Sequence, residues 1–206
     1  MAGGIGTRMK SDVPKQFLEI DGIPIIVRSI QKFLDYDSSV SIVVVLPEQH
    51  VDEWNEIKST YLSSTDITLT VGGKSRTESV MSGLAKIDET GLVAIHDAVR
   101  PFVSIKTIAD SFASASKHLS GVATVALKDS IREIGADTSA ARDRSNYVLV
   151  QTPQTFDVKA LKSAYKIAGD GLYTDDASVF EAAGNKVHLV DGTYDNIKIT
   201  TPEDLK

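Results

Sequence analysis

The chain has 206 residues, which is long enough for one domain with a sizeable hydrophobic core. Its 22 basic residues face 28 acidic ones, and the net charge of -6 argues against a broad nucleic-acid-binding surface. The sequence contains no cysteine, so disulfides, iron–sulfur clusters and thiolate zinc sites are excluded, and a reducing cytoplasm is the expected location. It shows no signal peptide, and no apolar run approaches the roughly 20 residues of a membrane span.

Apolar periodicity divides the first 126 residues into alternating helices and strands. The run Ile42–Leu46 is continuous, rich in β-branched residues and closed by Pro47, which is typical of a strand buried on both faces. Helices are predicted over 25–35, over 49–62, around 80–87 and behind an N-cap at Ser104, and further strands over 67–71, 92–95 and 121–126. This alternation predicts an α/β fold, a Rossmann-like and mostly parallel twisted sheet with helices on both faces. Ligands of such sheets bind beyond the carboxyl ends of the strands.

Residues 127–146 interrupt the alternation. This segment, LKDSIREIGADTSAARDRSN, is charged and lacks a helical stripe; two short strands around Gly135 would form a projecting β-arm, and a solvated loop fits equally well. A loop this long inside a compact domain is often functional. Beyond it we expect a strand over 147–150, helices over 157–168 and 175–183, and strands over 186–190 and 196–200, all within a single domain, 1–206. A first strand and a last helix are expected to be shortened or absent, because only two residues precede the first glycines and TPEDLK resembles the cap and first turn of a helix.

The opening stretch AGGIGTRMKSDVPKQF is a candidate anion site. Its candidate residues are three glycines, Gly3, Gly4 and Gly6, and two of its cations, Arg8 and Lys15. Successive N–H groups of a glycine-rich loop can surround a phosphate, and the cations can neutralise charge that develops at phosphorus during nucleotidyl transfer. The P-loop pattern is absent, and the dinucleotide pattern lacks its third glycine. A tight turn with two solvated cations is the alternative interpretation.

A second glycine pair precedes a predicted helix in VGGKSRTESVMSGL, residues 71–84. Lys74 and the hydroxyl groups of Ser75, Thr77 and Ser79 follow it. A strand, a glycine turn and a helix start could together offer N–H donors to a nucleobase or a phosphate. An ordinary capped helix is equally compatible with this pattern.

The stretch AIHDAVRPF, residues 94–102, places His96 and Asp97 at the end of a predicted strand. A carboxylate there can bind Mg²⁺, which prefers oxygen ligands and usually bridges to substrate phosphates. Pairing of Asp97 with Arg100, or a capped turn, is the alternative. No second histidine stands at metal-ligand spacing, so no zinc site is assigned and a structural role is favoured for His96.

Two motifs near the C-terminal end contain further candidates. In YTDDASVF, residues 173–180, Thr174 could be the N-cap of a helix whose first turn is acidic. In DNIKITTPEDL, residues 195–205, Lys198 interrupts an otherwise apolar predicted strand, so its amine should reach toward solvent or an anion.

Six motifs in order resemble one family over residues 2–206. They are A-G-G-x-G-x-R-M with P-K-Q-F, G-G-x-x-R-x-x-S-V, H-D-x-x-R-P-F, Q-T-P-Q-x-F, T-D-D-A and N-I-K-I-T-T-P-x-D-L. Together they are similar to the 2-C-methyl-D-erythritol 4-phosphate cytidylyltransferases of isoprenoid synthesis. Ribitol-5-phosphate cytidylyltransferases share most of the motifs and are the alternative, with a non-catalytic nucleotide-binding module as a more distant one.

The resemblance implies transfer of CMP from CTP, with Mg²⁺, to methylerythritol 4-phosphate, with release of pyrophosphate. It also implies a role for each matching residue. Arg8 and Lys15 would be catalytic, and Asp97 would lie near the metal and the substrate. Nucleotide contacts are implied for Ala2, Gly3, Gly4, Gly6, Gly73, Lys74 and Ser79, and substrate contacts for Asp97, Ser130, Arg144, Thr174 and Lys198.

The resemblance further implies that the 127–146 arm reaches a second subunit, which makes the working unit a homodimer. Two departures from the family pattern stand out. Ser130 occupies a position where threonine is common, which keeps the hydroxyl, and residue 7 is threonine where many members have a second basic residue. Arg144 in its D-R-S context favours the methylerythritol branch.

Overall fold

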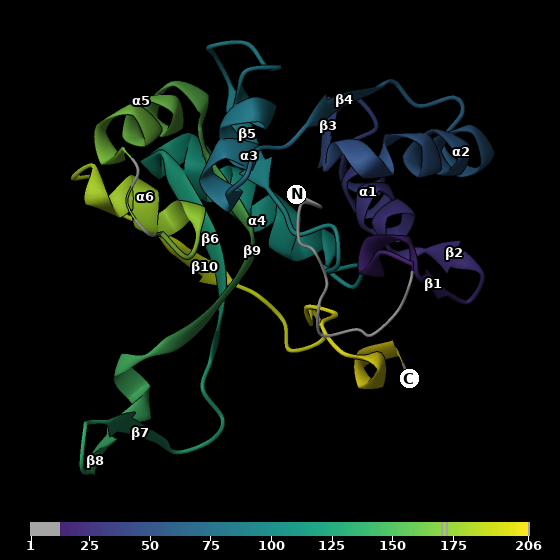
Figure 1. Ribbon diagram of the computed structural model, residues 1–206. Helices are drawn as coiled ribbons and strands as arrows, with labels where there is room; N and C mark the ends of the chain where they lie inside the picture. Colours follow the sequence, from purple (N-terminus) through teal and green to yellow (C-terminus); the bar gives the residue numbers. More distant parts are fainter. Residues whose placement is uncertain (1–12, 170, 172, 206) are drawn as a thin grey trace.

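The structure is a computed structural model that describes residues 13–169, 171 and 173–205. Its largest sheet has four strands in the order β10–β6–β9–β5, namely Leu189–Asp191, Ser120–Ala126, Val148–Asp157 and Leu92–Ile95 (Figure 1). β10 is parallel to β6, whereas β9 is antiparallel to both of its neighbours. The α/β class is confirmed, but this sheet is mixed and not mostly parallel. The chain leaves β6, forms the arm and returns along β6, and a strand that returns this way pairs antiparallel without a crossover helix.

A second, parallel pair consists of β3 (Ile42–Leu46) and β4 (Ile67–Val71), joined through α2 (Val51–Tyr61). Val44, Val45 and Leu46 are buried, as the continuous apolar run predicted. Together with β5, these strands line a cavity of about 510 Å³. Consecutive residues of β3 and β5 line this cavity, and among the described residues β3 pairs with β4 alone and β5 with β9 alone. Within the described part of the chain, β3 and β5 both line the cavity but do not pair with each other.

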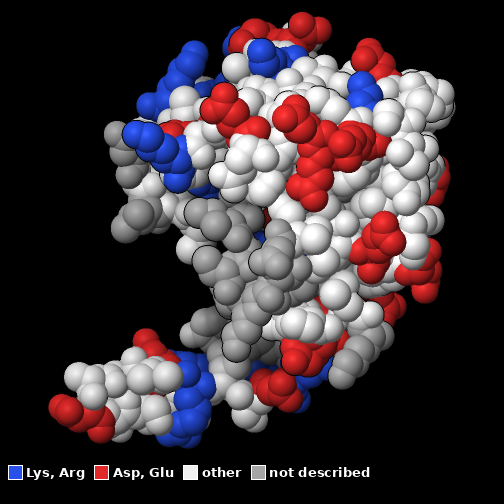
Figure 2. Space-filling model, turned by 45° about the vertical axis from the view of Figure 1, so that its right-hand side comes forward, with Lys and Arg blue, Asp and Glu red and all other residues white. Residues whose placement is uncertain are grey.

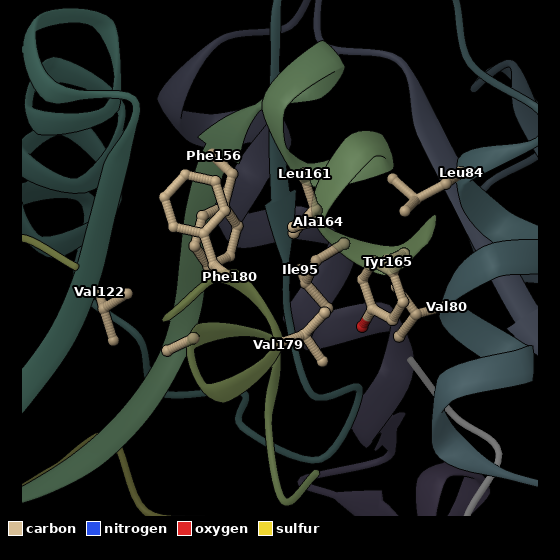
Figure 3. Packing of buried hydrophobic residues seen from close by; sticks show 11 residues of the cluster. Val80, Leu84, Ile95, Val122, Phe156, Leu161, Ala164, Tyr165, Val179 and Phe180 are labelled. Carbon is tan, nitrogen blue, oxygen red and sulfur yellow. The ribbon is translucent and has the colours of Figure 1, made fainter. Parts of the chain in front are cut away.

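Helices cover both faces of the four-stranded sheet. On one face α4 (Ile105–His118) lies so close to β6 that a Cβ at Gly121 would overlap the carbonyl oxygen of Ser111. On the other face α5 (Val158–Ala168) and α6 (Asp176–Ala182) build the core with α3 (Arg76–Leu84). Figure 3 shows Phe156 of β9 against Phe180 of α6, with Tyr165 in the same cluster. The amphipathic α1 (Ile25–Tyr36) directly follows, in the chain, the short hairpin of β1 (Glu19–Ile20) and β2 (Ile23–Pro24).

Residues 127–146 form the projecting arm and not a structureless loop. β7 (Ile131–Ile134) and β8 (Ser139–Arg142) pair antiparallel at its tip, and the arm stands clear of the rest of the molecule (Figure 1). Ile134 is 86% exposed at the tip. At the base of the arm Tyr147 and the first three residues of β9, Val148–Val150, are exposed as well.

Two strand predictions are corrected. The strand expected over 147–150 continues to Asp157, because polar residues in QTPQTF are buried and hydrogen-bonded within the sheet. The strand expected over 196–200 does not form; buried Ile199 instead anchors this segment, and its N–H donates to the Val99 carbonyl at 2.9 Å. Within the described part of the chain, none of the helices has the length and apolar character needed to cross a bilayer.

Candidate functional site

The carboxylate of Asp97 lies just beyond β5 between two cations. Lys198 Nζ is 3.0 Å and Arg100 Nε 3.2 Å from the same oxygen, Oδ2. Arg100 is fixed by a second bond of 2.7 Å from its Nη1 to the Asn196 carbonyl. The group carries one negative and two positive charges, so it has an excess positive charge available to an anion.

Burial alone would favour the neutral form of Asp97. The attraction of Lys198 and Arg100 outweighs this effect and holds the pKa of Asp97 well below its usual range. Lys198 keeps 44% of its side chain exposed, whereas Asp97 keeps 16%. A phosphate that approaches from solvent therefore meets the amine of Lys198 before it meets the carboxylate.

Behind Asp97, a short hydrogen-bonded chain fixes the loop. Thr152 Oγ1 accepts a hydrogen bond of 3.0 Å from the Asp97 N–H and lies 3.2 Å from His96 Nδ1. His96 Nε2 is 3.1 Å from the Arg100 carbonyl, which can only accept, so Nε2 carries the proton. Burial lowers the pKa of His96 to about 4 and keeps the ring neutral. His96 is thus a structural element of this loop.

The glycine turn between β4 and α3 is held by the helix that follows it. Ser79 Oγ receives the Gly73 N–H at 3.2 Å and donates to the Ser75 carbonyl at 2.8 Å. Glu78 Oε2 receives the Lys74 N–H at 2.7 Å. The two N–H groups that we expected to face a ligand are therefore bonded within the turn. Ser79 is buried and shapes the turn, whereas the side chain of Lys74 is exposed.

Thr174 lies at the start of α6 but does not cap it. The N-cap is Asp175, whose Oδ1 receives the Ser178 N–H at 2.9 Å and whose Oδ2 receives Gln154 Nε2, also at 2.9 Å. The cap is displaced by one position because Asp175 can reach both the helix and β9. Thr174 is left exposed, free of the capping role that was its alternative interpretation.

The structure brings some of the predicted residues together and leaves others apart. Asp97 and Lys198 form one cluster, and Gly73, Lys74 and Ser79 form one turn. Lys15 starts a short 3₁₀ helix, Lys15–Phe17, and is partly exposed. Ser130 and Arg144 are exposed on the arm, where Arg144 donates to the Lys128 carbonyl. Five predicted positions lie outside the described residues: Ala2, Gly3, Gly4, Gly6 and Arg8.

Sequence reasoning missed two functional residues of the Asp97 group. Arg100 was considered only as a competing partner of Asp97, and Thr152 was not considered at all. Both stand in quoted motifs, H-D-x-x-R-P-F and Q-T-P-Q-x-F. Thr152 reaches Asp97 across 55 positions of the chain, and Arg100 is fixed by the Asn196 carbonyl across 96 positions, neither of which motif spacing reveals.

An α/β fold that gathers cations around one carboxylate beyond a strand end, beside a glycine turn that opens a helix, is the arrangement expected of phosphate-handling nucleotide enzymes. The comparisons with known proteins identify the particular group within this class. The family model for 2-C-methyl-D-erythritol 4-phosphate cytidylyltransferase matches residues 1–206. The chain belongs to this family and is a nucleotidyltransferase acting on methylerythritol 4-phosphate; the ribitol alternative is not favoured.

Individual relatives agree with this assignment. The enzyme of that name from Bacteroides thetaiotaomicron is 42% identical over 206 residues, which cover 100% of this chain and 94% of the relative. The crystal structure of the Francisella tularensis enzyme is similar with a TM-score of 0.81 and 31% identity, covering 99% of this chain and 93% of the other. The Thermus thermophilus enzyme has the same TM-score at 28% identity, with 99% and 92% covered.

Proposed function

We propose that the Asp97 cluster binds the phosphate of the acceptor and that the glycine turn at Gly73 and Lys74 binds the cytidine of CTP. The observation that carries this proposal is the excess positive charge at Asp97, where Lys198 and Arg100 share one carboxylate oxygen. A monoester phosphate is an anion that can accept charge-assisted hydrogen bonds from such a group. Thr174 and Lys198 would complete the contacts to the acceptor.

The chemistry then follows from charge. An oxygen of the acceptor phosphate attacks the α-phosphorus of CTP in line, the new P–O bond forms, and the bond to pyrophosphate breaks. Negative charge grows on the oxygens around the α-phosphorus and on the departing pyrophosphate. Lys15, with Arg8 and the glycines at 3, 4 and 6, would stabilise this charge, because preorganised cations cost no reorganisation during the reaction.

Asp97 is also the residue that would hold Mg²⁺. Both cations contact Oδ2, and among the described residues no hydrogen bond or ion pair uses Oδ1. The described part of the chain contains no cluster of three metal-binding side chains. A magnesium ion at this site would take one ligand from Asp97 and the others from phosphate and water, and it would neutralise phosphate charge.

We further propose that the enzyme works as a homodimer through the arm. An arm that exposes Ile134 at its tip and an apolar strand segment, Val148–Val150, at its base is an unusual surface for a monomer. Figure 2 shows the arm across an open notch from the main body, with Lys and Arg side chains on it. Ser130 and Arg144 would then complete the acceptor site of a second subunit. The cytoplasm, where CTP is available, is the proposed location.

Pyrophosphate release from CTP and Mg²⁺ tests the site, with methylerythritol 4-phosphate and ribitol 5-phosphate measured in parallel. We expect release with the first acceptor only. In Lys15→Ala, kcat should fall by roughly 10²–10³-fold, the cost of losing one preorganised transition-state donor. Lys106→Ala, at an exposed lysine of α4, is the matched control and should keep the wild-type rate. A Lys15→Ala enzyme with normal kcat would remove Lys15 from the catalytic group.

Mixed dimers test the shared site. Arg144→Ala should weaken acceptor binding more than CTP binding, and Lys15→Ala should be slow. A mixture of the two variants after subunit exchange should recover about a quarter of wild-type activity, because half of the dimers are mixed and each has one intact site. Activity that stays at the level of the separate variants would show that each subunit builds its site alone.

A further inference from the structure

Three helices meet at one carboxylate that the catalytic scheme above does not use. Asp176, the first residue of α6, has a fully buried side chain. Its Oδ2 receives a charge-assisted hydrogen bond from Arg76 Nη2, and Arg76 is the first residue of α3. Its Oδ1 receives the hydroxyl of Tyr165, on α5, at 2.5 Å.

The charges within this group balance. Burial disfavours the charged form of Arg76, but Asp176 outweighs this effect and raises the pKa of Arg76 further above its usual range. Burial and the neighbouring Asp176 also raise the pKa of Tyr165, which stays a hydrogen-bond donor. Unlike the Asp97 group, the group has no excess charge for an anion. Its role must therefore depend on the parts of the chain that it joins.

The position of the pair in the chain shows what it connects. Arg76 follows Lys74 by two residues, and Asp176 follows Thr174 by two residues. The bond therefore joins the turn proposed to bind cytidine to the loop proposed to bind the acceptor. Asp97 is close enough to contribute to the raised pKa of Arg76, so the junction lies within electrostatic reach of the third part of the site.

The start of α6 is also fixed from the sheet. Gln154, in β9, receives the Ala177 N–H on Oε1 at 2.9 Å and donates from Nε2 to Asp175 at 2.9 Å. With α6 anchored to β9 by Gln154, the Arg76–Asp176 bond sets where α3 and its glycine turn lie relative to the sheet. Truncating either partner would leave a buried group unpaired.

We propose that Arg76 and Asp176 are positioning residues that set the separation between the nucleotide turn and the acceptor loop. This inference rests on the proposed function. In-line transfer needs the attacking oxygen and the α-phosphorus within a narrow distance and angle, and a shift of about 1 Å in such a pair can cost roughly 10²-fold in rate. A buried ion pair fixes direction and distance more strictly than apolar contact, and its net contribution to stability is often small.

An apolar replacement separates positioning from stability. In Arg76→Met/Asp176→Leu/Tyr165→Phe all three polar partners leave together, so no buried group is left unpaired, and we expect the variant to fold with a Tm near that of the wild type. Its kcat should nevertheless fall at least tenfold at saturating CTP and acceptor. The matched control, Lys106→Met/Asp110→Leu, removes an exposed pair on α4 and should leave kcat unchanged. A folded triple variant with wild-type kcat would overturn the proposal.

A distance measurement tests the link without any turnover. Because the chain has no cysteine, Lys74→Cys/Thr174→Cys can carry two spin labels at exposed positions without further changes. With labelled chains diluted into an excess of unlabelled chains, so that only the distance within one subunit is measured, we expect a narrow distribution in the otherwise native protein and a broader one when the triple replacement is added. An unchanged distribution would overturn the link. If the distribution broadens but the wild-type protein releases no pyrophosphate from CTP, the proposed function would be contradicted and the structural link would stand.

Discussion

Two aspartates with similar partners differ in what their surroundings allow. Asp97 and Asp176 each receive a bond from an arginine and lie at the start of a loop or helix. Asp97 has a second cation, Lys198, and remains partly open to solvent, whereas Asp176 has a neutral tyrosine instead and is fully buried. The first group can accept an anion and the second cannot.

The difference shows how one ion-pair chemistry serves two purposes. Where cations outnumber the carboxylate and one of them reaches water, the group is ready for a phosphate. Where charges match and the carboxylate is shielded from water, the group fixes helices relative to one another. Each of the following predictions changes one of these properties.

Removal of Asp176 should give the largest effect on stability. In Asp176→Ala, Arg76 loses its counter-charge and the Tyr165 hydroxyl loses its acceptor inside the core, so the free energy of unfolding should fall by about 3–5 kcal/mol. Asp97→Ala should cost less, because Lys198 can turn toward solvent. Urea denaturation of both variants measures the difference. Equal losses would contradict the distinction between a closed and an open group.

Acidification should weaken the Asp97 region in a defined pH range. His96 is neutral in the folded protein with a pKa of about 4, against 6.5 as the ordinary value. As the pH falls from 6.5 to 4, the unfolded chain gains a proton that the folded chain does not, so stability is lost within that range, on the order of 3 kcal/mol in total. In His96→Gln this loss should largely disappear from the pH dependence of urea denaturation. The Asp176 group contains no histidine, so Tyr165→Phe should keep the wild-type pH dependence.

Tyr165 stands where the Asp97 group has its second cation, and it should contribute less to the free energy of unfolding than Arg76. Tyr165→Phe removes one hydrogen bond to a buried carboxylate and leaves Arg76 in place, so the free energy of unfolding should fall by about 1.5–3 kcal/mol. Tyr61→Phe is the control, because the Tyr61 hydroxyl donates to the Gly22 carbonyl at the surface. A loss in Tyr165→Phe no larger than in this control would show that Arg76 alone satisfies Asp176.

Much of the fold follows from local pattern. The apolar run of β3, the periodicity of α1 and the Ser104 cap of α4 all form as predicted, because each depends on neighbouring residues. The second half of β9 could not be predicted in this way. Most of its residues are polar, and their burial is made possible by partners on other elements, such as Ser111 of α4 for Thr155 at 2.8 Å.

The two aspartates also differ in how much of their role local sequence predicts. Asp97 stands at the end of an apolar strand, a place where sheets of this kind bind ligands, and Lys198 was predicted to reach toward solvent or an anion. Asp176 looked like an ordinary acidic residue in the first turn of a helix. Its burial depends on Arg76, which lies 100 positions away in the chain, so local sequence carries no signal for it.

Lys198→Met should give the smallest effect and the most specific one. It removes the exposed cation of the Asp97 group and leaves Arg100, so the excess positive charge disappears while the buried bond remains. The KM for methylerythritol 4-phosphate should rise by about tenfold, equivalent to about 1.4 kcal/mol, and the KM for CTP should change little. Lys198→Arg keeps the charge and should recover part of the loss. Steady-state kinetics with each substrate varied in turn provides the measurement. A rise in the KM for CTP alone would instead place the open group on the nucleotide, and Asp97 would then be part of the triphosphate site.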